Sequence, residues 1–346
     1  MRINIIFKIC LTILIMSSQV MSQNYVSIIQ DLENQKDPAL QLDILDRAIA
    51  HTHFKEYPDT LAMLYYQKSN VLFSGSVSIA ASITALDQGI ALIDEIKDRD
   101  LWIKLWYYKG FRYRKWDKYE EAKQALSQVL KYKEDNLYIW DATIQLGKTY
   151  KDRGEFSVAL DTYDHALTLA GDDKDMLATT YEVISFVYLI MDTKEGARSS
   201  IPWLIKLIDH LGTMEDEESF IASMHYNVGT AYLTLEEYKE AEKWFDKSEE
   251  LLDACCIDKD LKSLLYEVRA NLMLEEGRYD EAIANYKKGL ELYQHSFDLT
   301  RSDGLSSSYH LIASAYDLKG DFNNALSYIS KAVSYTHLTL PTICSV

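Results

Sequence analysis

The stretch LWIKLWYYKGFRYRKWDKYEEAKQALSQVLKYKE, from Leu101 to Glu134, decides the fold of this chain. Trp106, Gly110 and Tyr113 follow one another at intervals of four and three residues, which places them on one face of a helix. The same spacing recurs on a second helix, whose apolar face carries Tyr119, Ala122, Leu126 and Val129. The stretch therefore predicts two helices joined by a short turn.

This pattern resembles the tetratricopeptide repeat, which runs W-x2-L-G-x2-Y and then G-x-Y-x2-A-x3-F-x2-A. The resemblance implies that Gly110 lies where the two helices cross and that Ala122 packs into that crossing. Further copies follow down the chain. The repeat-core positions that we expect are Trp106, Gly110, Tyr113, Ala122, Gly147, Tyr150, Ala159, Gly229, Tyr232, Ala241, Gly277, Ala282, Gly320 and Ala325.

Equivalent small positions of successive copies show the period of the repeat. They are Asn70, Gly110, Gly147, Ser185, Gly229, Ala270 and Ala313, with steps of 40, 37, 38, 44, 41 and 43 residues. All steps exceed the minimal repeat of about 34 residues, so the chain resembles a longer-period subclass. We expect an all-α fold, a right-handed α-solenoid of about seven stacked hairpins over residues 60–332. Residues 23–59 form a partial first repeat, with Asp37–Ala50 as its second helix.

The first 22 residues have the pattern of a secretory signal peptide. Arg2 and Lys8 carry positive charge before the apolar run Ile9–Met16. Small residues that suit cleavage by a signal peptidase follow this run and end at Ser22. The run is too short for a comfortable membrane span. The alternative is a buried first helix. We expect the chain to be exported, and to be periplasmic or extracellular after cleavage.

The last residues, 333–346, differ in character from the rest. Val333–Thr342 reads VSYTHLTLPT and resembles the translation of a sequencing-library adapter. The alternative is a natural β-prone tail. If the resemblance holds, residues 333–346 are a non-native tail and the natural sequence stops being visible near Ala332, so that membrane association would depend on sequence beyond it.

Charge and motifs argue against several functions. The chain has 53 acidic and 36 basic residues, and a net charge of −17 argues against nucleic acid. Phosphate-binding loops, nucleophile elbows and zinc-protease motifs are missing from the sequence. His51 and His53 have the wrong spacing for a metal pair, and residues 215–218 lack the spacing of a calcium loop. We predict no catalytic residue, no metal and no cofactor.

Cysteine usage predicts no disulfide framework. Only the adjacent pair Cys255 and Cys256 lies between the two terminal segments, and adjacent cysteines close only a strained ring. We interpret them as two small residues at the end of a helix, with a redox switch as the alternative.

The repeat family lines its concave groove with the first helix of each hairpin. Carried onto this chain, the resemblance implies a peptide-binding groove at Lys104, Tyr107, Phe111, Arg114, Lys115, Lys148, Lys151, Phe186, Tyr226 and Asn271, with Asp141, Ile144, Asp152, Glu182, Glu267 and His310 at further groove positions. The carboxylate-clamp variety of the family has Lys and Asn where Tyr107 and Phe111 stand, so that clamp is not predicted.

Four groove cations form a basic patch in an acidic protein: Arg114, Lys115, Lys148 and Lys151. Cations beside the rings of Tyr107 and Phe111 suit an acidic or carboxylate-ended peptide. The alternative is a charged face that is merely solvated.

Three classes of function follow. The first is an exported scaffold that binds a protein or peptide and catalyses nothing. The second is the sensor region of a longer protein, because signal peptides followed by such repeats resemble the front halves of bacterial membrane-anchored histidine kinases and helix-turn-helix regulators. The third, an enzyme whose catalytic domain lies outside this sequence, has no support in the residues present.

Overall fold

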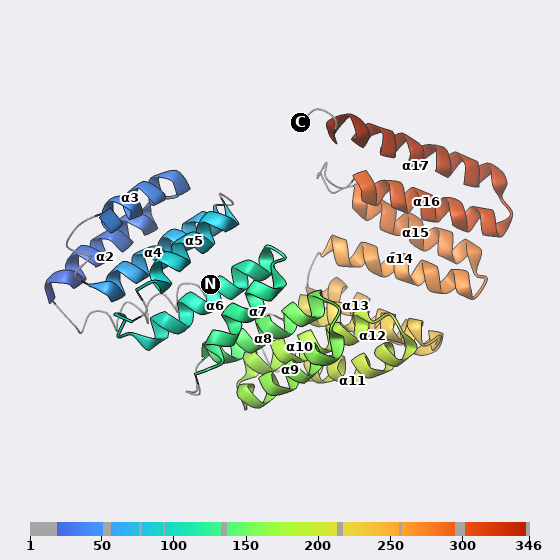
Figure 1. Ribbon diagram of the computed structural model, residues 1–346. Helices are drawn as coiled ribbons and strands as arrows, with labels where there is room; N and C mark the ends of the chain where they lie inside the picture. The colour runs from blue at the N-terminus through green and yellow to red at the C-terminus, as the bar shows by residue number, and fades with distance from the viewer. Residues whose placement is uncertain are drawn as a thin grey trace. The chain divides into compact units, whose positions relative to one another are not determined.

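The computed structural model of the chain describes residues 19–50, 57–75, 78–92, 94–132, 137–212, 217–255, 258–294 and 302–343. These residues form sixteen helices and no strand, which confirms the expected all-α fold of helical hairpins (Figure 1). The chain divides into two compact units, Met1–Gly171 and Asp172–Val346. The boundary follows Gly171, which ends a helix with a positive φ of 52°.

Unit 1 contains eight helices in its described part. They are α2 (Gln19–Asn34), α3 (Pro38–Ala50), α4 (Pro58–Ser74), α5 (Ile79–Ile90), α6 (Arg99–Lys115), α7 (Tyr119–Val129), α8 (Leu137–Asp152) and α9 (Phe156–Ala170).

Unit 2 contains eight more within its described residues. They are α10 (Lys174–Ile190), α11 (Lys194–Leu211), α12 (Glu218–Thr234), α13 (Tyr238–Cys255), α14 (Lys259–Glu275), α15 (Tyr279–Gln294), α16 (Ser302–Lys319) and α17 (Phe322–Ile343).

Helix starts are fixed by short polar side chains. Asp98 accepts hydrogen bonds from the backbone amides of Asp100 and Leu101 at the start of α6, and Asp258 does the same for α14. The hydroxyl of Thr193 accepts a hydrogen bond from the backbone amide of Gly196 at the start of α11. Each cap satisfies amides that have no partner within the helix and stabilises its start by about 1 kcal/mol.

Small residues sit where the two helices of a hairpin cross, as predicted. A Cβ built on Gly110 would lie 2.6 Å from Cγ of Leu126, and Gly147 and Gly229 meet the rings of Tyr163 and Phe245 even more closely. The alanines Ala122, Ala159, Ala241 and Ala282 are fully buried, and Ala325 is 8% exposed. Among the larger expected core residues, Trp106, Tyr113, Tyr150 and Tyr232 are half-buried.

Two expected core positions were wrong. Gly277 and Gly320 lie in exposed turns between the helices of their hairpins, with φ values of 73° and 86°. The amide that follows each one donates to a carbonyl five residues back, as in Arg278 N to Met273 O at 2.8 Å. These glycines therefore close the helix in a left-handed turn that other residues adopt at a cost.

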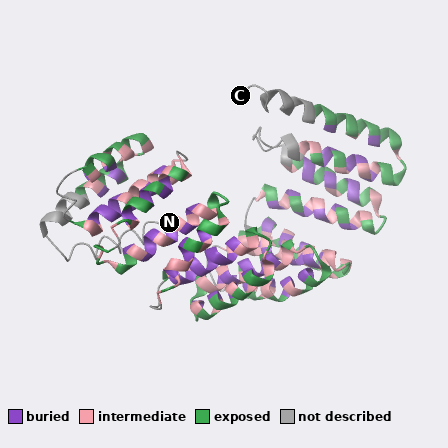
Figure 2. Ribbon diagram, in the orientation of Figure 1, coloured by how far each residue is buried: buried purple, intermediate pink, exposed green. Residues whose placement is uncertain are grey.

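The hairpins stack because each second helix also packs against the next first helix. In unit 1 this holds for α5 with α6 and for α7 with α8, and in unit 2 for α11 with α12, α13 with α14 and α15 with α16. Figure 2 shows buried residues along the faces where neighbouring helices meet. Burial of these apolar faces makes the largest favourable contribution to the folding free energy of a repeat protein.

The ends of the chain add one correction. Most of the expected signal peptide, residues 1–18, lies outside the described residues, but α2 begins at Gln19 and packs against α3. Asp37–Ala50, the expected second helix of the partial first repeat, therefore has a partner helix in the described residues. At the other end, α17 runs to Ile343 through most of the adapter-like segment. None of the helices described here is long and apolar enough to cross a membrane.

Candidate peptide-binding surface

The first helices of three successive hairpins adjoin in unit 1. Helix α6 contacts α4 on one side and α8 on the other, besides its own partner α7. Gly110 lies on the face of α6 that packs against α7, where its lack of a side chain makes room for Leu126. Side chains that bridge α4, α6 and α8 therefore use other faces of α6. We call the surface made by Phe73, Phe111, Arg114, Lys115, Lys148 and Lys151 the unit 1 face.

Phe111 lies at the centre of the unit 1 face. Its ring meets the ring of Phe73 from α4 edge to face, with centroids 5.9 Å apart. The guanidinium carbon of Arg114 and the ammonium of Lys115 each lie 5.9 Å from the centroid of Phe111. Cations at this distance are attracted by the electron-rich face of the ring. Phe111 of α6 therefore contacts α4 through Phe73 and attracts the cations of Arg114 and Lys115.

Asp152 shares its carboxylate between two of the predicted cations. Arg114 Nη1 donates to one oxygen at 3.0 Å, and Lys151 Nζ lies 2.8 Å from the other. Arg114 Nε also donates to Oε1 of Gln145 at 3.0 Å. The side chains of Arg114 and Asp152 are only 12% and 21% exposed, so this pair is held more firmly than a freely solvated one.

Asp141 is the second acid of this surface. Tyr107 donates a hydrogen bond to its carboxylate, and Lys148 attracts it electrostatically. Burial nevertheless dominates and raises the pKa of Asp141, while the same burial raises the pKa of Tyr107. Asp152 thus engages Arg114 and Lys151, and Asp141 interacts with Lys148.

Two predicted groove residues lie beneath the surface. Lys104 and Tyr107 are each 7% exposed. The ammonium of Lys104 lies 4.9 Å from the ring centroid of Tyr66 in α4, and the ring of Tyr107 packs on Tyr138 in α8. They join the three first helices, whereas Phe111, Arg114, Lys115, Lys148 and Lys151 are half-buried or exposed.

Unit 2 holds the other predicted residues. Phe186 in α10 is 50% exposed, and Ile190, one turn later, is 38% exposed. Tyr226 in α12 is half-buried against the ring of Phe245, and the exposed Asn271 in α14 accepts a hydrogen bond from Tyr286. The predicted set is thus split between the two units, with its cations in unit 1.

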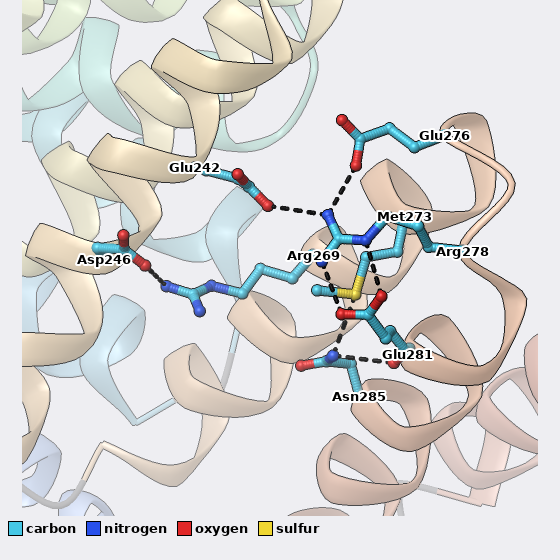
Figure 3. A network of polar contacts seen from close by, with 8 residues as sticks. All are labelled: Glu242, Asp246, Arg269, Met273, Glu276, Arg278, Glu281 and Asn285. Carbon is cyan, nitrogen blue, oxygen red and sulfur yellow. Dashed lines mark hydrogen bonds and ion pairs between the residues drawn. The ribbon is translucent and has the colours of Figure 1, made fainter.

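A separate charged network in unit 2 braces the stack. Arg278 donates from Nε and Nη2 to both carboxylate oxygens of Glu281, at 2.9 and 2.7 Å. Its Nη1 reaches Glu276 at 2.7 Å and Glu242 of α13 at 3.3 Å, and Arg269 pairs with Asp246 of α13 at 2.6 Å (Figure 3). These arginines link α13 to the following hairpin, and carboxylates already engage them.

Sequence reasoning missed the partners of these cations. The pairing of Arg114 with Gln145 and the contact of Phe111 with Phe73 join residues about one repeat apart. The period of the repeat was visible in the sequence, but it does not say which rotamer brings two such side chains together.

In the described part of the chain, no group of three or more His, Cys, Asp or Glu side chains is placed so that it could hold a metal ion. The pair His51 and His53 and the first half of the acidic run at residues 215–218 fall outside the described ranges. Cys255 ends α13, as expected of a small residue at a helix end, and Cys256 lies outside the described residues.

Several known proteins resemble this chain. Response regulator aspartate phosphatase J of Bacillus subtilis is 29% identical over 161 residues, which are 39% of this chain and 42% of that protein. The chain thus spans about two fifths of that relative. The crystal structure of apo RapI aligns with a TM-score of 0.56 and 12% identity over 80% of this chain and 97% of RapI.

Two further structures share the fold. A tetratricopeptide repeat protein from Parabacteroides merdae has a TM-score of 0.53 and 17% identity, over 79% of this chain and 93% of its own. The C-terminal part of a repeat protein from Cytophaga hutchinsonii has a TM-score of 0.54 and 19% identity, over 78% and 98%. Tetratricopeptide repeat models match residues 103–136, 142–177, 220–295 and 262–335, more than half of the sequence. The chain belongs to the tetratricopeptide repeat family.

Proposed function

We propose that this chain is an exported scaffold that binds an acidic segment of another protein on the unit 1 face. The observation that carries the proposal is the charge of α6. Residues Arg99–Lys115 contain six basic side chains and one acidic one, and four of the six, all but Lys104 and Arg112, are not buried, in a chain whose net charge is −17. Such a helix stands out from its surroundings and attracts acidic partners over several ångströms.

The chemistry of the unit 1 face supports an acidic ligand with an apolar or aromatic anchor. Phe111 offers an apolar surface, and the neighbouring cations of Arg114 and Lys115 can pair with carboxylates beside it. Asp152 already engages Arg114 and Lys151. A ligand carboxylate would share those two cations, whereas Lys115 is exposed and can turn outward from Phe111.

The relatives are consistent with protein binding in general terms. The name of the Bacillus subtilis relative states that it acts on response regulators, which are proteins. We do not extend that activity to this chain, because the match covers 42% of the relative. Our proposal is a binding module without a catalytic step.

Charge reversal tests the proposal directly. The probe is a fluorescein-labelled peptide that alternates pairs of glutamates with single phenylalanines, and its binding is followed by fluorescence anisotropy. Lys115→Glu combined with Lys148→Glu is expected to weaken binding at least tenfold, because like charges then face the probe. The control is Lys239→Glu combined with Lys243→Glu, which changes net charge equally on α13. Equal binding by all three proteins, or equal loss in both variants, would sink the proposal.

Export is the second part of the proposal and is tested separately. The signal-peptide pattern leads us to expect a mature protein that begins at Gln23. N-terminal sequencing of the protein recovered from the periplasm or the medium checks this. Retention in the cytoplasm with Met1 intact would contradict export and leave the unit 1 face unaffected.

A second candidate is the sensor region of a longer membrane-anchored regulator. The resemblance of residues 333–342 to an adapter favours it, because the natural sequence would then differ beyond Ala332. Reading the native gene past Ala332 decides the matter. An apolar stretch of about 20 residues followed by a further domain would support the sensor, and VSYTHLTLPT in the native gene would remove its basis.

A further inference from the structure

Asp152 pairs with two cations of the unit 1 face in the way that a ligand carboxylate would. One of its oxygens accepts from Nη1 of Arg114 at 3.0 Å, and the other lies 2.8 Å from Nζ of Lys151. None of the three side chains is more than 21% exposed, so these pairs are held more firmly than solvated ones. A carboxylate that comes from outside must compete with Asp152 for the same cations.

The end of α8 is an unfavourable place for an acid. Asp152 is the last residue of α8, where backbone carbonyls without a partner in the helix carry partial negative charge. The helix end repels the carboxylate, and Arg114 and Lys151 attract it. The position of Asp152 therefore depends on these two cations and weakens when another anion takes them up.

A second partner for Asp152 lies in α9. The ring of Tyr163 is fully buried against Gly147 of α8, and its hydroxyl has no hydrogen-bond partner among the described residues. A buried hydroxyl in this state is unfavourable and uncommon. Burial, and next the charge of Asp152, raise the pKa of Tyr163, so the hydroxyl keeps its proton and can donate. The influence of that charge also means that Asp152 lies near the hydroxyl.

We propose that Asp152 is an internal competitor of the acidic ligand for Arg114 and Lys151. When a ligand carboxylate pairs with these cations, Asp152 turns away and accepts a hydrogen bond from the hydroxyl of Tyr163. The inference rests on the proposed function, because it concerns the same face and the same class of ligand.

Arg114 keeps its place during this exchange. Its Nε donates to Oε1 of Gln145 at 3.0 Å, and Gln145 is 7% exposed. This hydrogen bond does not involve Asp152, so the guanidinium stays oriented when the carboxylate leaves. Without a ligand the face is thus closed by its own acid, and its affinity for acidic segments is reduced by the fraction of molecules in that closed state.

Removal of the Asp152 charge tests the proposal on the full chain. The probe is the fluorescein-labelled peptide of paired glutamates and single phenylalanines, followed by fluorescence anisotropy. Asp152→Asn is expected to tighten binding about tenfold, because the ligand then meets no competing carboxylate. The matched control is Glu155→Gln, which removes the same charge three residues later from a carboxylate that pairs with Arg153 at 2.9 Å. It is expected to change the dissociation constant less than about threefold.

Tyr163→Phe tests where Asp152 goes. Phenylalanine keeps the ring against Gly147 and removes only the hydroxyl, and circular dichroism checks that the fold is unchanged. Binding is expected to weaken about threefold in the wild-type background, because the displaced carboxylate loses its hydrogen bond. In the Asp152→Asn background the same substitution should leave binding unchanged. A purely structural role of Tyr163 would weaken binding equally in both backgrounds and would overturn this step.

The outcomes separate this inference from the proposed function. If wild type binds the peptide and Asp152→Asn binds it equally well, the competitor role is wrong and the binding face stands. Equal tightening by Glu155→Gln would also overturn the inference, since any lost negative charge would then suffice. Binding by Asp152→Asn alone would mean that Asp152 closes the face completely, which supports the inference. Failure of both proteins to bind would overturn the inference and the proposed function together.

Discussion

Arg112 of α6 donates from Nη2 to Oδ1 of Asn70 in α4 at 2.7 Å, and so joins two successive hairpins. Arg112 is 1% exposed, and no described carboxylate forms an ion pair with it. The rings of Phe73 and Tyr108 lie 4.9 and 5.2 Å from its guanidinium carbon. Burial lowers the pKa of Arg112 to about 10. The amide and the two rings therefore take the place of a counter-ion.

Removing the side-chain amide of Asn70 is expected to lower the free energy of unfolding more than removing the charge of Arg112. Asn70→Ala leaves a buried guanidinium donor without its acceptor, and we expect a loss of about 1–3 kcal/mol of unfolding free energy. Arg112→Met removes the charge and keeps an apolar chain about as long as the aliphatic stem of arginine, so it is expected to cost less. Urea unfolding followed by circular dichroism measures both. A larger loss in Arg112→Met would show that the cation itself stabilises the stack.

Glycines at crossings and glycines in turns are expected to respond differently to alanine. Gly147→Ala forces a methyl group into the buried ring of Tyr163, and overpacking of this kind costs about 1–3 kcal/mol. Gly277→Ala meets no atom within 4 Å but keeps a φ of 73°, which costs about 1–2 kcal/mol. The double variant Gly147→Ala, Tyr163→Leu makes room for the methyl group. In thermal unfolding, the double variant should lose less stability than the sum of the losses of Gly147→Ala and Tyr163→Leu. A loss equal to that sum would contradict the packing argument.

The sequence was sufficient for the hairpins and their crossings, because small residues at a fixed period have one structural use. Gly110, Gly147 and Gly229 were placed correctly for that reason. The sequence was misleading at Gly277 and Gly320, since the repeat motif contains a second glycine that lies in the turn between the two helices. In the turn after α12, Glu236 adopts a φ of 63° without any glycine, so no composition rule could identify that position.

His225 is expected to make unit 2 less stable in acid. It lies beside Trp244, with ring centroids 5.4 Å apart, and the ammonium of Lys247 lies 3.8 Å from the centroid of Trp244. Burial, and next the charge of Lys247, lower the pKa of His225 below its usual 6.5. The unfolded chain then takes up the proton first, so stability falls as the pH drops below about 6.5.

Replacing the imidazole isolates this effect. His225→Phe keeps a ring beside Trp244 and removes the titrating group. The melting temperature is expected to fall more between pH 7.5 and pH 5.5 in wild type than in His225→Phe. An equal or larger fall in the variant would show that His225 does not contribute.

The brace around Arg278 is expected to depend on salt. Its side chain is 35% exposed and pairs with three carboxylates, so Arg278→Gln should cost up to about 1 kcal/mol at low ionic strength. Salt screens such pairs, and the loss should shrink near 1 M salt. Lys243→Gln, with a side chain 65% exposed and one local partner, serves as the control and should change little. A loss in Arg278→Gln that is independent of salt would point to packing instead.

The candidate binding surface was only partly visible in the sequence. The family register selected Phe111, Arg114, Lys115, Lys148 and Lys151, which the structure gathers in unit 1. It also selected Lys104 and Tyr107, which are buried, because the register gives a position on a helix and not the depth of the side chain. The carboxylate of Asp152 between Arg114 and Lys151 follows from tertiary packing alone.

Site-specific photo-crosslinking tests the central claim most directly, namely that the unit 1 face binds an acidic segment. A photoreactive phenylalanine analogue replaces Phe111, which keeps the ring and all four cations, in one protein and the exposed Asp161 of α9 in another. The fluorescein-labelled acidic peptide is then irradiated with each protein. We predict labelling through position 111 that excess unlabelled peptide abolishes, and little labelling through position 161. Equal labelling at both positions, or labelling through position 161 alone, would contradict it.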